Sequence, residues 1–357
     1  MCNGTIMDKL ISFSLPLMLS GILQLMFNAV DIVVVGRFSG SQSLAAVGST
    51  TALINVFTNL FIGISLGANV LAARFFAAGK SKEMSDTVHT SVTLALISGV
   101  VMAFVGLFFS RGALELMGTP ADVIGQSALY MKIYFLGMPF FMLYNYGAAI
   151  LRAVGDTKRP LIFLVVSGVV NAILNMILVI VFHLDVAGVA IATVISQMIS
   201  CILVIRCLCN SQNSYQLYFS KLRINKDYLK QIFQVGIPAG IQSTVINFSN
   251  ALLQSSVNSF GSTAMAGYTA ANNIFGFLYV AVNSVTQACM SFTSQNYGVR
   301  KFKRMDKVLI DCIIISVVTA LTLGCSAYFF GPELLKIYTK DTDVIRCGME
   351  ILSYTTV

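Results

Sequence analysis

The residue best suited to ion chemistry is Asp31, an acid inside a long apolar stretch. Residues 10–36 carry no other charge and are long enough to cross a bilayer as one helix. A charged side chain at the bilayer centre costs about 2.5–3.5 kcal/mol on insertion scales unless it is paired, hydrated or neutralised. Asp31 therefore indicates a site for a cation or a proton. The alternative is an acid near the helix end that snorkels into water, since Gly36 follows closely.

Polar side chains form two stripes at helical spacing, which predicts two polar helix faces. The first stripe is Ser20, Gln24, Asn28 and Asp31, and the second is Ser243, Asn247, Asn250, Gln254 and Asn258. Hydrogen bonding between helices is one explanation. A water-filled cavity shared by both stripes is the one we favour. The side chains expected to line it are Gln24, Met26, Phe27, Asn28, Tyr144, Gln242, Asn247, Asn250, Gln254, Asn272, Phe275 and Tyr279.

Composition indicates that these faces belong to membrane-spanning helices. Hydrophobic residues make up 56% of the 357 residues and charged residues only 11%, where soluble domains carry about 25%. We therefore predict an all-α, multi-pass membrane protein in contact with the lipid bilayer. Apolar segments of spanning length recur at 10–36, 44–73, 88–109, 133–151, 161–182, 186–205, 232–260, 265–292 and 308–330, and a tenth begins near Val344.

The net charge of +8 is explained by topology rather than by nucleic-acid binding. If the N-terminus is cytoplasmic, seventeen Lys and Arg residues fall in inside loops and six in outside loops. This positive-inside bias supports an N-in orientation in the plasma (inner) membrane. We expect no nucleic-acid partner.

The remaining chemistry-bearing residues point to no enzyme and no resident metal. The eight cysteines form no CxxC motif, and His89 and His183 stand apart from each other. There is no HExxH motif and no pair of catalytic acids at membrane depth. The first span is too long and too polar for a signal peptide. The expected cofactor is none, apart from a coupling ion.

The chain repeats itself with a period of about 220 residues. Pro16 in "LISFSLPLMLSGILQ" matches Pro238 in "QIFQVGIPAGIQSTV", with six spans between equivalents. An even number of spans makes the two copies parallel. The expected divisions are a six-helix bundle at 1–206, a cytoplasmic linker at 207–228 and an incomplete second bundle at 229–357. On this count the chain is a fragment or a truncated product. Aligning the prolines sets Leu253 against Asp31, so the acid belongs to the first bundle alone.

Three motifs resemble those of the multidrug and toxic compound extrusion family. They are "NAVDIVVVGRFSGSQSLAAVG" around Asp31, "AAILRAVGDTKRPL" at 148–161 and "NAILNMILVIVFHLDVAGVAIATVIS" at 171–196. The resemblance implies two helical bundles around a central cavity that exchange external H⁺ or Na⁺ for organic, often cationic, substrates. The closest branch resembles the DNA-damage-inducible transporters.

In that branch the resemblance implies a cation site inside the first bundle. The matching positions are Asp31, Asn145, Asn171, Asn175 and Thr193, with Na⁺ held at Asp31, Asn171, Asn175 and Thr193. Many members carry a second Asp at the position of Asn175, so H⁺ is favoured here over Na⁺. The other large branch has a Glu at the position of Ile246, which argues against that branch. Asn171 and Asn175 lie one helical turn apart, so both amides can face Asp31.

The leading hypothesis is a monomeric secondary antiporter that exports amphipathic or cationic small molecules by alternating access, coupled through Asp31. A lipid-linked oligosaccharide flippase of the same superfamily is the alternative within transport. It is disfavoured because the predicted cavity faces carry no Lys or Arg. A non-transporting fragment and an intramembrane enzyme are the alternatives from other classes. Gly63 to Gly67, "GISLG", predicts close helix packing, and Pro16, Pro139 and Pro238 predict helix kinks.

Overall fold

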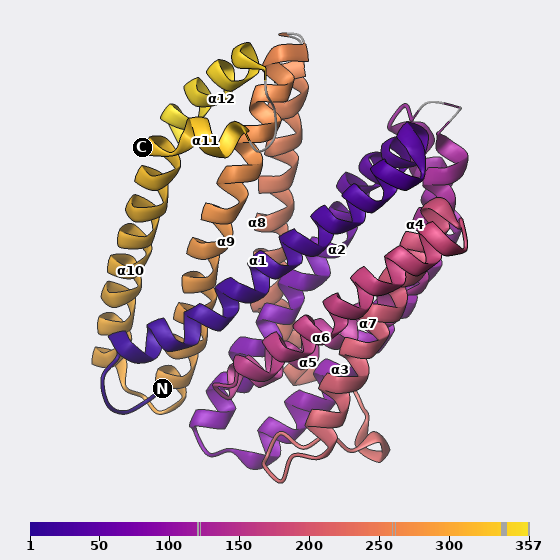
Figure 1. Ribbon diagram of the computed structural model, residues 1–357. Helices are drawn as coiled ribbons and strands as arrows, with labels where there is room; N and C mark the ends of the chain where they lie inside the picture. The colour runs from indigo at the N-terminus through magenta and orange to yellow at the C-terminus, as the bar shows by residue number, and fades with distance from the viewer. Residues whose placement is uncertain (120, 122, 259, 261, 337–340, 356–357) are drawn as a thin grey trace.

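The protein is helical throughout the part of the chain that the computed structural model describes, which is residues 1–119, 121, 123–258, 260, 262–336 and 341–355. Figure 1 shows the helices in two groups that meet along α2 and α8. The first group is α1 (Met7–Phe38), α2 (Gly40–Ala77), α3 (Ser81–Leu116), α4 (Ile124–Leu136), α5 (Met138–Ala153), α6 (Lys158–Asn175), the π-helix η1 (Met176–Val181) and α7 (Asp185–Cys209). The second is α8 (Lys226–Asn258), α9 (Ser262–Gly298), α10 (Phe302–Phe329), α11 (Gly331–Lys336) and α12 (Thr342–Thr355), preceded by the short 3₁₀-helix η2 (Phe219–Lys221).

The helices are long and apolar enough to confirm a multi-pass membrane protein. Within the described residues, seven helices meet the length and composition expected of a span, and the bent pair α4–α5 is a candidate eighth. The predicted span at 133–151 is thus the second part of a longer, broken element. The predicted span at 232–260 lies largely in α8, a helix of 33 residues. Its many amides and hydroxyls make α8 less apolar than the seven helices that meet the criterion for a span. The segment near Val344 forms α12, a helix of 14 residues.

Helix α1 connects the two groups. Figure 1 shows it running from the side of α10 at its start to the neighbourhood of α4 and α7 at its end. Its first turns bury Leu10, Phe13 and Leu17 against residues of α9 and α10, including Phe292. Its later turns pack on α6 and α7 instead. A change near the end of α1 can therefore reach both groups through one rigid element.

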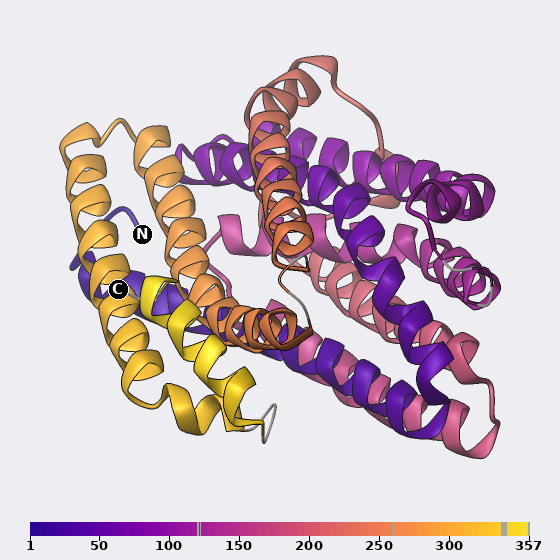
Figure 2. The ribbon, with the colours of Figure 1, turned by 90° about the horizontal axis from the view of Figure 1, so that it is seen from above.

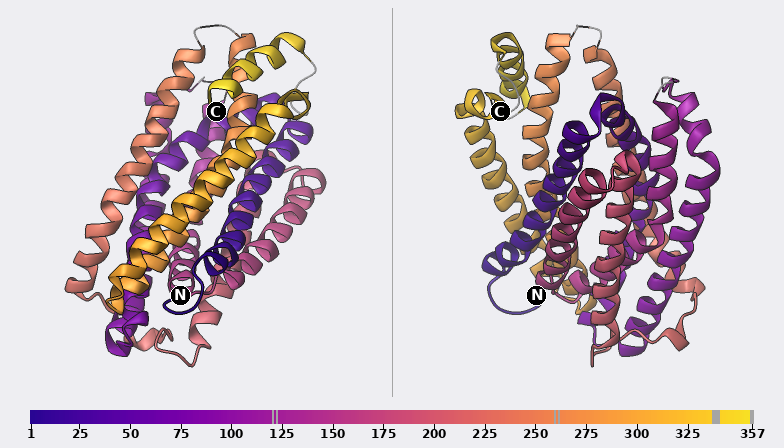
Figure 3. Two further views of the ribbon diagram at one scale, coloured as in Figure 1. Left: turned by 90° about the vertical axis from the view of Figure 1, so that its left-hand side faces the viewer. Right: turned by 45° about the vertical axis from the view of Figure 1, so that its right-hand side comes forward.

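Glycines bring α2 and α8 into close contact, as "GISLG" predicted. A side chain at Gly63 would collide with the backbone of Gly240, and one at Gly67 would meet Ile232 O and the nitrogen of Gly236. The same five residues also spell the G-x-S-x-G pattern of hydrolases. Ser65 nevertheless lies inside a continuous helix and donates to Ile62 O (2.6 Å), rather than on the strand-to-helix turn of those enzymes. Figures 2 and 3 show α8 lying across α2 from further directions.

The prolines have different effects. Pro139 follows the break at Gly137, where α4 and α5 meet at 48°, so the predicted kink is confirmed there. Pro16 and Pro238 lie inside the continuous helices α1 and α8.

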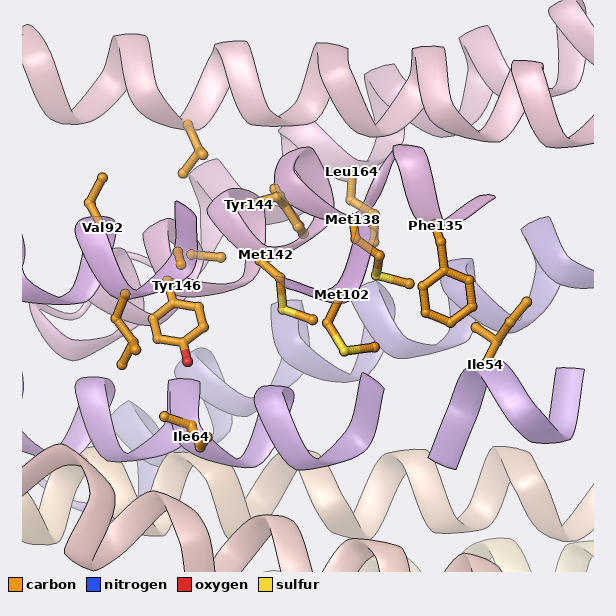
Figure 4. Packing of buried hydrophobic residues seen from close by; sticks show 14 of the residues in the cluster. Ile54, Ile64, Val92, Met102, Phe135, Met138, Met142, Tyr144, Tyr146 and Leu164 are labelled. Carbon is orange, nitrogen blue, oxygen red and sulfur yellow. The ribbon is translucent and has the colours of Figure 1, made fainter. Parts of the chain in front are cut away.

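The main core lies among α2, α3, α5 and their neighbours. Figure 4 shows Met102, Phe135, Met138 and Met142 interdigitating there with Tyr146. All five of these side chains are buried. This packing holds α4 and α5, which both contact α7.

Candidate ion and substrate site

Asp31 is buried in the structure. Its side chain is 9% exposed, although its neighbours Ile32 and Val33 on α1 are exposed. The carboxylate faces α6 and α7 rather than the helix end. The snorkelling alternative is therefore wrong, and a buried carboxylate without a basic partner in the described ion pairs needs hydrogen bonds, a proton or a cation.

A short network of amides and a hydroxyl surrounds this carboxylate. The Asn175 amide donates to Asp31 Oδ1 and also to Asn171 Oδ1 (3.2 Å). The Asn171 amide donates to Thr193 Oγ1 at 3.5 Å, and the Thr193 hydroxyl donates to Val189 O at 2.9 Å. Thr193 also interacts with Asp31. The structure thus brings together four of the five predicted ion-site residues, from α1, α6 and α7.

The network has an unused acceptor next to the acid. Asn175 Oδ1 is buried and has no hydrogen-bond partner among the described residues. A buried carbonyl oxygen without a partner is unfavourable by about 1–3 kcal/mol. A cation could take this oxygen together with the carboxylate and the other side-chain oxygens, which are ligands that hard cations prefer. A protonated Asp31 could also donate to Oδ1 after the amide turns over. The donor set therefore fits either coupling ion.

Asn145 differs from the expectation. It is half-buried on α5, and its amide donates to Phe141 O of the same helix at 2.8 Å. Within the described residues, no hydrogen bond joins Asn145 to the Asp31 network. The resemblance placed Asn145 in the site, but in the structure its amide donates to a backbone carbonyl of its own helix instead.

Several features around the site were not anticipated. Tyr130 and Tyr134 on α4 lie near enough to Asp31 to interact with it electrostatically. The two tyrosines are four residues apart and so share one helical face. This spacing is visible in the sequence, but the predicted ion site did not include these tyrosines. The chain after Asn175 turns into the π-helix η1, a feature often found at functional sites.

A glycine sets the distance between α1 and α6 beside the network. Any side chain at Gly168 would overlap the Phe27 ring, so the ring packs directly on the α6 backbone. Phe27 lies one turn before Asp31, and Gly168 lies one turn before Asn171. The predicted cavity residue Phe27 is therefore half-buried and positions the ion network.

The other predicted cavity residues divide by exposure. Tyr144 was predicted to line the cavity, and this prediction is wrong. Its side chain is buried in the core and donates to Pro160 O (3.2 Å) (Figure 4). Asn247 and Phe275 are half-buried, and the Asn247 amide donates to Ser243 O at 2.8 Å. The side chain of Gln254 lies outside the described residues. The exposed members are Gln24, Met26, Asn28, Gln242, Asn250, Asn272 and Tyr279.

Polar contacts join the two groups at the end of the molecule that carries the N-terminus. Ser291 of α9 donates to Asn69 Oδ1 of α2 at 3.0 Å, and Asn69 donates to Ala149 O of α5 at 2.8 Å. Gln295 of α9 donates to Ala153 O at 2.7 Å. These contacts close the interface at what the predicted topology makes the cytoplasmic end.

Arg152 lies in the same interface. It donates to Gln287 Oε1 of α9 at 3.2 Å, and its Nε is buried without a partner among the described residues. The sequence predicted cavity faces that carry no Lys or Arg. The structure differs because the last turn of α5 points Arg152 at α9 rather than at the membrane surface.

In the described part of the chain, the fold and site together define a multi-span membrane protein whose one buried acid is Asp31. The MatE family model matches residues 16–177 and 238–357, and the chain belongs to this family. Members are transporters rather than enzymes and need no cofactor beyond coupling ions.

Known relatives agree with this assignment. The chain is 30% identical to "Probable multidrug resistance protein YoeA" of Bacillus subtilis, over 96% of this chain and 76% of that protein. It is 23% identical to "Multidrug export protein MepA" of Staphylococcus aureus (strain NCTC 8325), over 99% of this chain and 78% of that one.

Solved structures share the fold. An outward-facing MATE multidrug resistance transporter superposes with a TM-score of 0.91 at 22% identity, covering 98% of this chain and 78% of that one. A transporter of the MOP superfamily from Pyrococcus furiosus gives 0.90 at 23% identity, over 99% and 78%.

Proposed function

We propose that this chain is a secondary antiporter that exports organic cations or other amphipathic drugs in exchange for H⁺ or Na⁺, with Asp31 as the coupling residue. The observation that carries the proposal is the buried carboxylate of Asp31, bonded by Asn175 and set beside the unused Asn175 Oδ1. Relatives named for multidrug resistance and export support the drug-export part.

Coupling follows from the place of α1. Binding a proton or cation at Asp31 neutralises its charge and changes which atoms Asn175 can donate to or accept from. Because α1 packs on α6 and α7 near Asp31 and on α9 and α10 near its start, a shift of α1 alters the contact between the groups. An ion can bias a transporter between two facings only if it binds them with different affinity. The α1 contacts supply a route for that difference.

The cytoplasmic-end contacts supply the second element of alternating access. The bonds of Asn69 to Ser291 and of Gln295 to Ala153 O hold the groups together at that end. Opening toward the cytoplasm requires these bonds to break. The protein would release substrate outside while these bonds are formed and load substrate from inside while they are broken.

The substrate class follows from the exposed side chains on α1, α8 and α9. Met26 and Tyr279 are exposed on α1 and α9, and so are the amide side chains of Asn28 and Asn272 on the same helices. Aromatic faces attract organic cations, and flexible Met side chains adapt to several shapes. We therefore expect several planar hydrophobic cations to be exported. These exposed side chains give no support to the flippase alternative.

Transport by the purified chain in proteoliposomes tests the proposal. A pH gradient without Na⁺ should drive movement of a planar cationic dye, because a single carboxylate with neutral oxygens suits a proton better than Na⁺. Movement that requires Na⁺ and ignores the pH gradient would reverse the choice of ion. Dye movement unaffected by either gradient would contradict antiport.

A further inference from the structure

A basic cavity lies between the start of α3 and the segment that joins α7 to α8, away from the Asp31 network. Its volume is about 580 Å³. It is lined by Lys82, Ser85, Asp86, His89, Ser220, Lys221, Leu222 and Arg223. Figure 1 shows this connecting segment folded under the first group at the end that carries the N-terminus.

The cavity carries uncompensated positive charge. Arg223 is paired with Asp86 at 2.7 Å, which accounts for the only acid among the lining residues. Lys82 has no ion pair among the described residues, and the ammonium of Lys221 lies 4.5 Å from the centre of the Tyr218 ring. Two ammonium groups therefore remain for a negatively charged ligand.

Two hydrogen bonds fix His89 in the wall of the cavity. Its Nδ1 donates to Ser85 O at 2.6 Å, and its Nε2 accepts from the backbone N–H of Tyr218 at 3.1 Å. Asn225 N–H donates to Thr90 Oγ1 at 3.2 Å. The connecting segment is thus docked on α3 by specific bonds, so the lysines are presented by a defined structure.

The surroundings place this cavity at the level of lipid headgroups. Helix α3 has 36 residues, a length of about 54 Å, which exceeds a hydrocarbon core of about 30 Å. Its first turns, with Lys82 and Asp86, therefore extend into the headgroup region. Tyr218, Phe219 and Ile224 beside the cavity are 42%, 64% and 38% exposed. Exposed aromatic and apolar side chains next to lysines are typical of segments that lie in the membrane interface.

We propose that this cavity binds the phosphate headgroup of an anionic phospholipid of the cytoplasmic leaflet. The ammonium groups of Lys82 and Lys221 contact the phosphate, and Phe219 inserts among the acyl chains. Basic pockets of this kind on the cytoplasmic side bind acidic headgroups. The lipid would fasten the connecting segment, and through it the start of α8, to the first group.

Lipid binding to the purified full chain tests the proposal, with phosphatidylglycerol in phosphatidylcholine nanodiscs as the probe. Lys82→Gln combined with Lys221→Gln should weaken phosphatidylglycerol binding by roughly tenfold or more. Lys303→Gln combined with Lys307→Gln removes two exposed lysines from the cytoplasmic end of α10 and should change it less than twofold. Equal Tm values in pure phosphatidylcholine would show that both variants fold.

Two results would overturn the proposal. They are a loss of phosphatidylglycerol binding in the Lys82 and Lys221 double variant that is no greater than in the α10 control, and full competition of phosphatidylglycerol binding by millimolar glycerol phosphate. The last result would assign the cavity to a soluble phosphate compound. Phe219→Ser offers a second check, because it should weaken phosphatidylglycerol binding while leaving all lysines in place.

Discussion

Asn175 donates its side-chain amide to Asp31 across 144 residues of chain. The pair joins α6 to α1, and the other polar atom of the amide, Oδ1, has no hydrogen-bond partner among the residues that the structure describes. Under the proposed coupling, this combination favours H⁺ over Na⁺, because one carboxylate and neutral oxygens hold Na⁺ less firmly than two carboxylates.

Asn175→Asp should therefore increase the Na⁺ dependence of transport. The variant places a second carboxylate against Asp31, where two like charges are unfavourable without a cation between them. We expect Na⁺ to raise the Tm of this variant and to stimulate its dye export, with little effect on the wild type. Tm measured with NaCl against choline chloride checks this. A variant that responds to Na⁺ no more than the wild type would show that the carboxylates cannot share an ion.

Gly168→Ala tests the packing that positions the network. The added methyl group would overlap the Phe27 ring and push α1 from α6, at a cost of about 1–3 kcal/mol. We expect a lower Tm and reduced ion-driven transport. Gly112→Ala on α3 is the matched control, because a side chain there meets no atom within 4 Å. That change should leave Tm equal or slightly higher. Equal behaviour of the two variants would count against the role given to Gly168.

The contact between Asn69 and Ser291 tests whether the cytoplasmic end must open. Asn69→Cys and Ser291→Cys, introduced into a chain without its eight native cysteines, place two thiols where side chains now share a 3.0 Å hydrogen bond. A short bifunctional thiol reagent should stop transport in the double variant, and a reductant should restore it if the reagent carries a disulfide. Each single variant should be insensitive. Undiminished transport after complete crosslinking would mean that this contact stays closed throughout the cycle.

Much of the fold could be predicted from the sequence because apolar length and helical spacing act locally. The close packing of "GISLG" and the break before Pro139 follow from the properties of glycine and proline. Residues 232–260, most of which form α8, were predicted to be an apolar span because their apolar residues are numerous. The amides among them reduce that apolar character.

The ion network was predictable in part. Asp31 stands out because an acid in an apolar span is costly, and Asn171 and Asn175 share a face by spacing alone. Tyr144 and Asn145 were misplaced because helix rotation depends on tertiary packing, which turned Tyr144 into the core. Arg152 was missed for the same reason: the direction of a side chain at a helix end depends on which helix lies opposite.

The central claim is that Asp31 couples the ion to export, and Asp31→Asn tests it most directly. Asparagine keeps the size of the side chain and its hydrogen bonding to Asn175 but cannot carry the charge. Asp8→Asn, at an exposed position in the first turn of the same helix, is the matched control. Dye export driven by an ion gradient should be measured in proteoliposomes at equal amounts of folded protein. The account predicts that Asp31→Asn abolishes gradient-driven export while Asp8→Asn retains it. Export by Asp31→Asn at close to the wild-type rate would contradict the account.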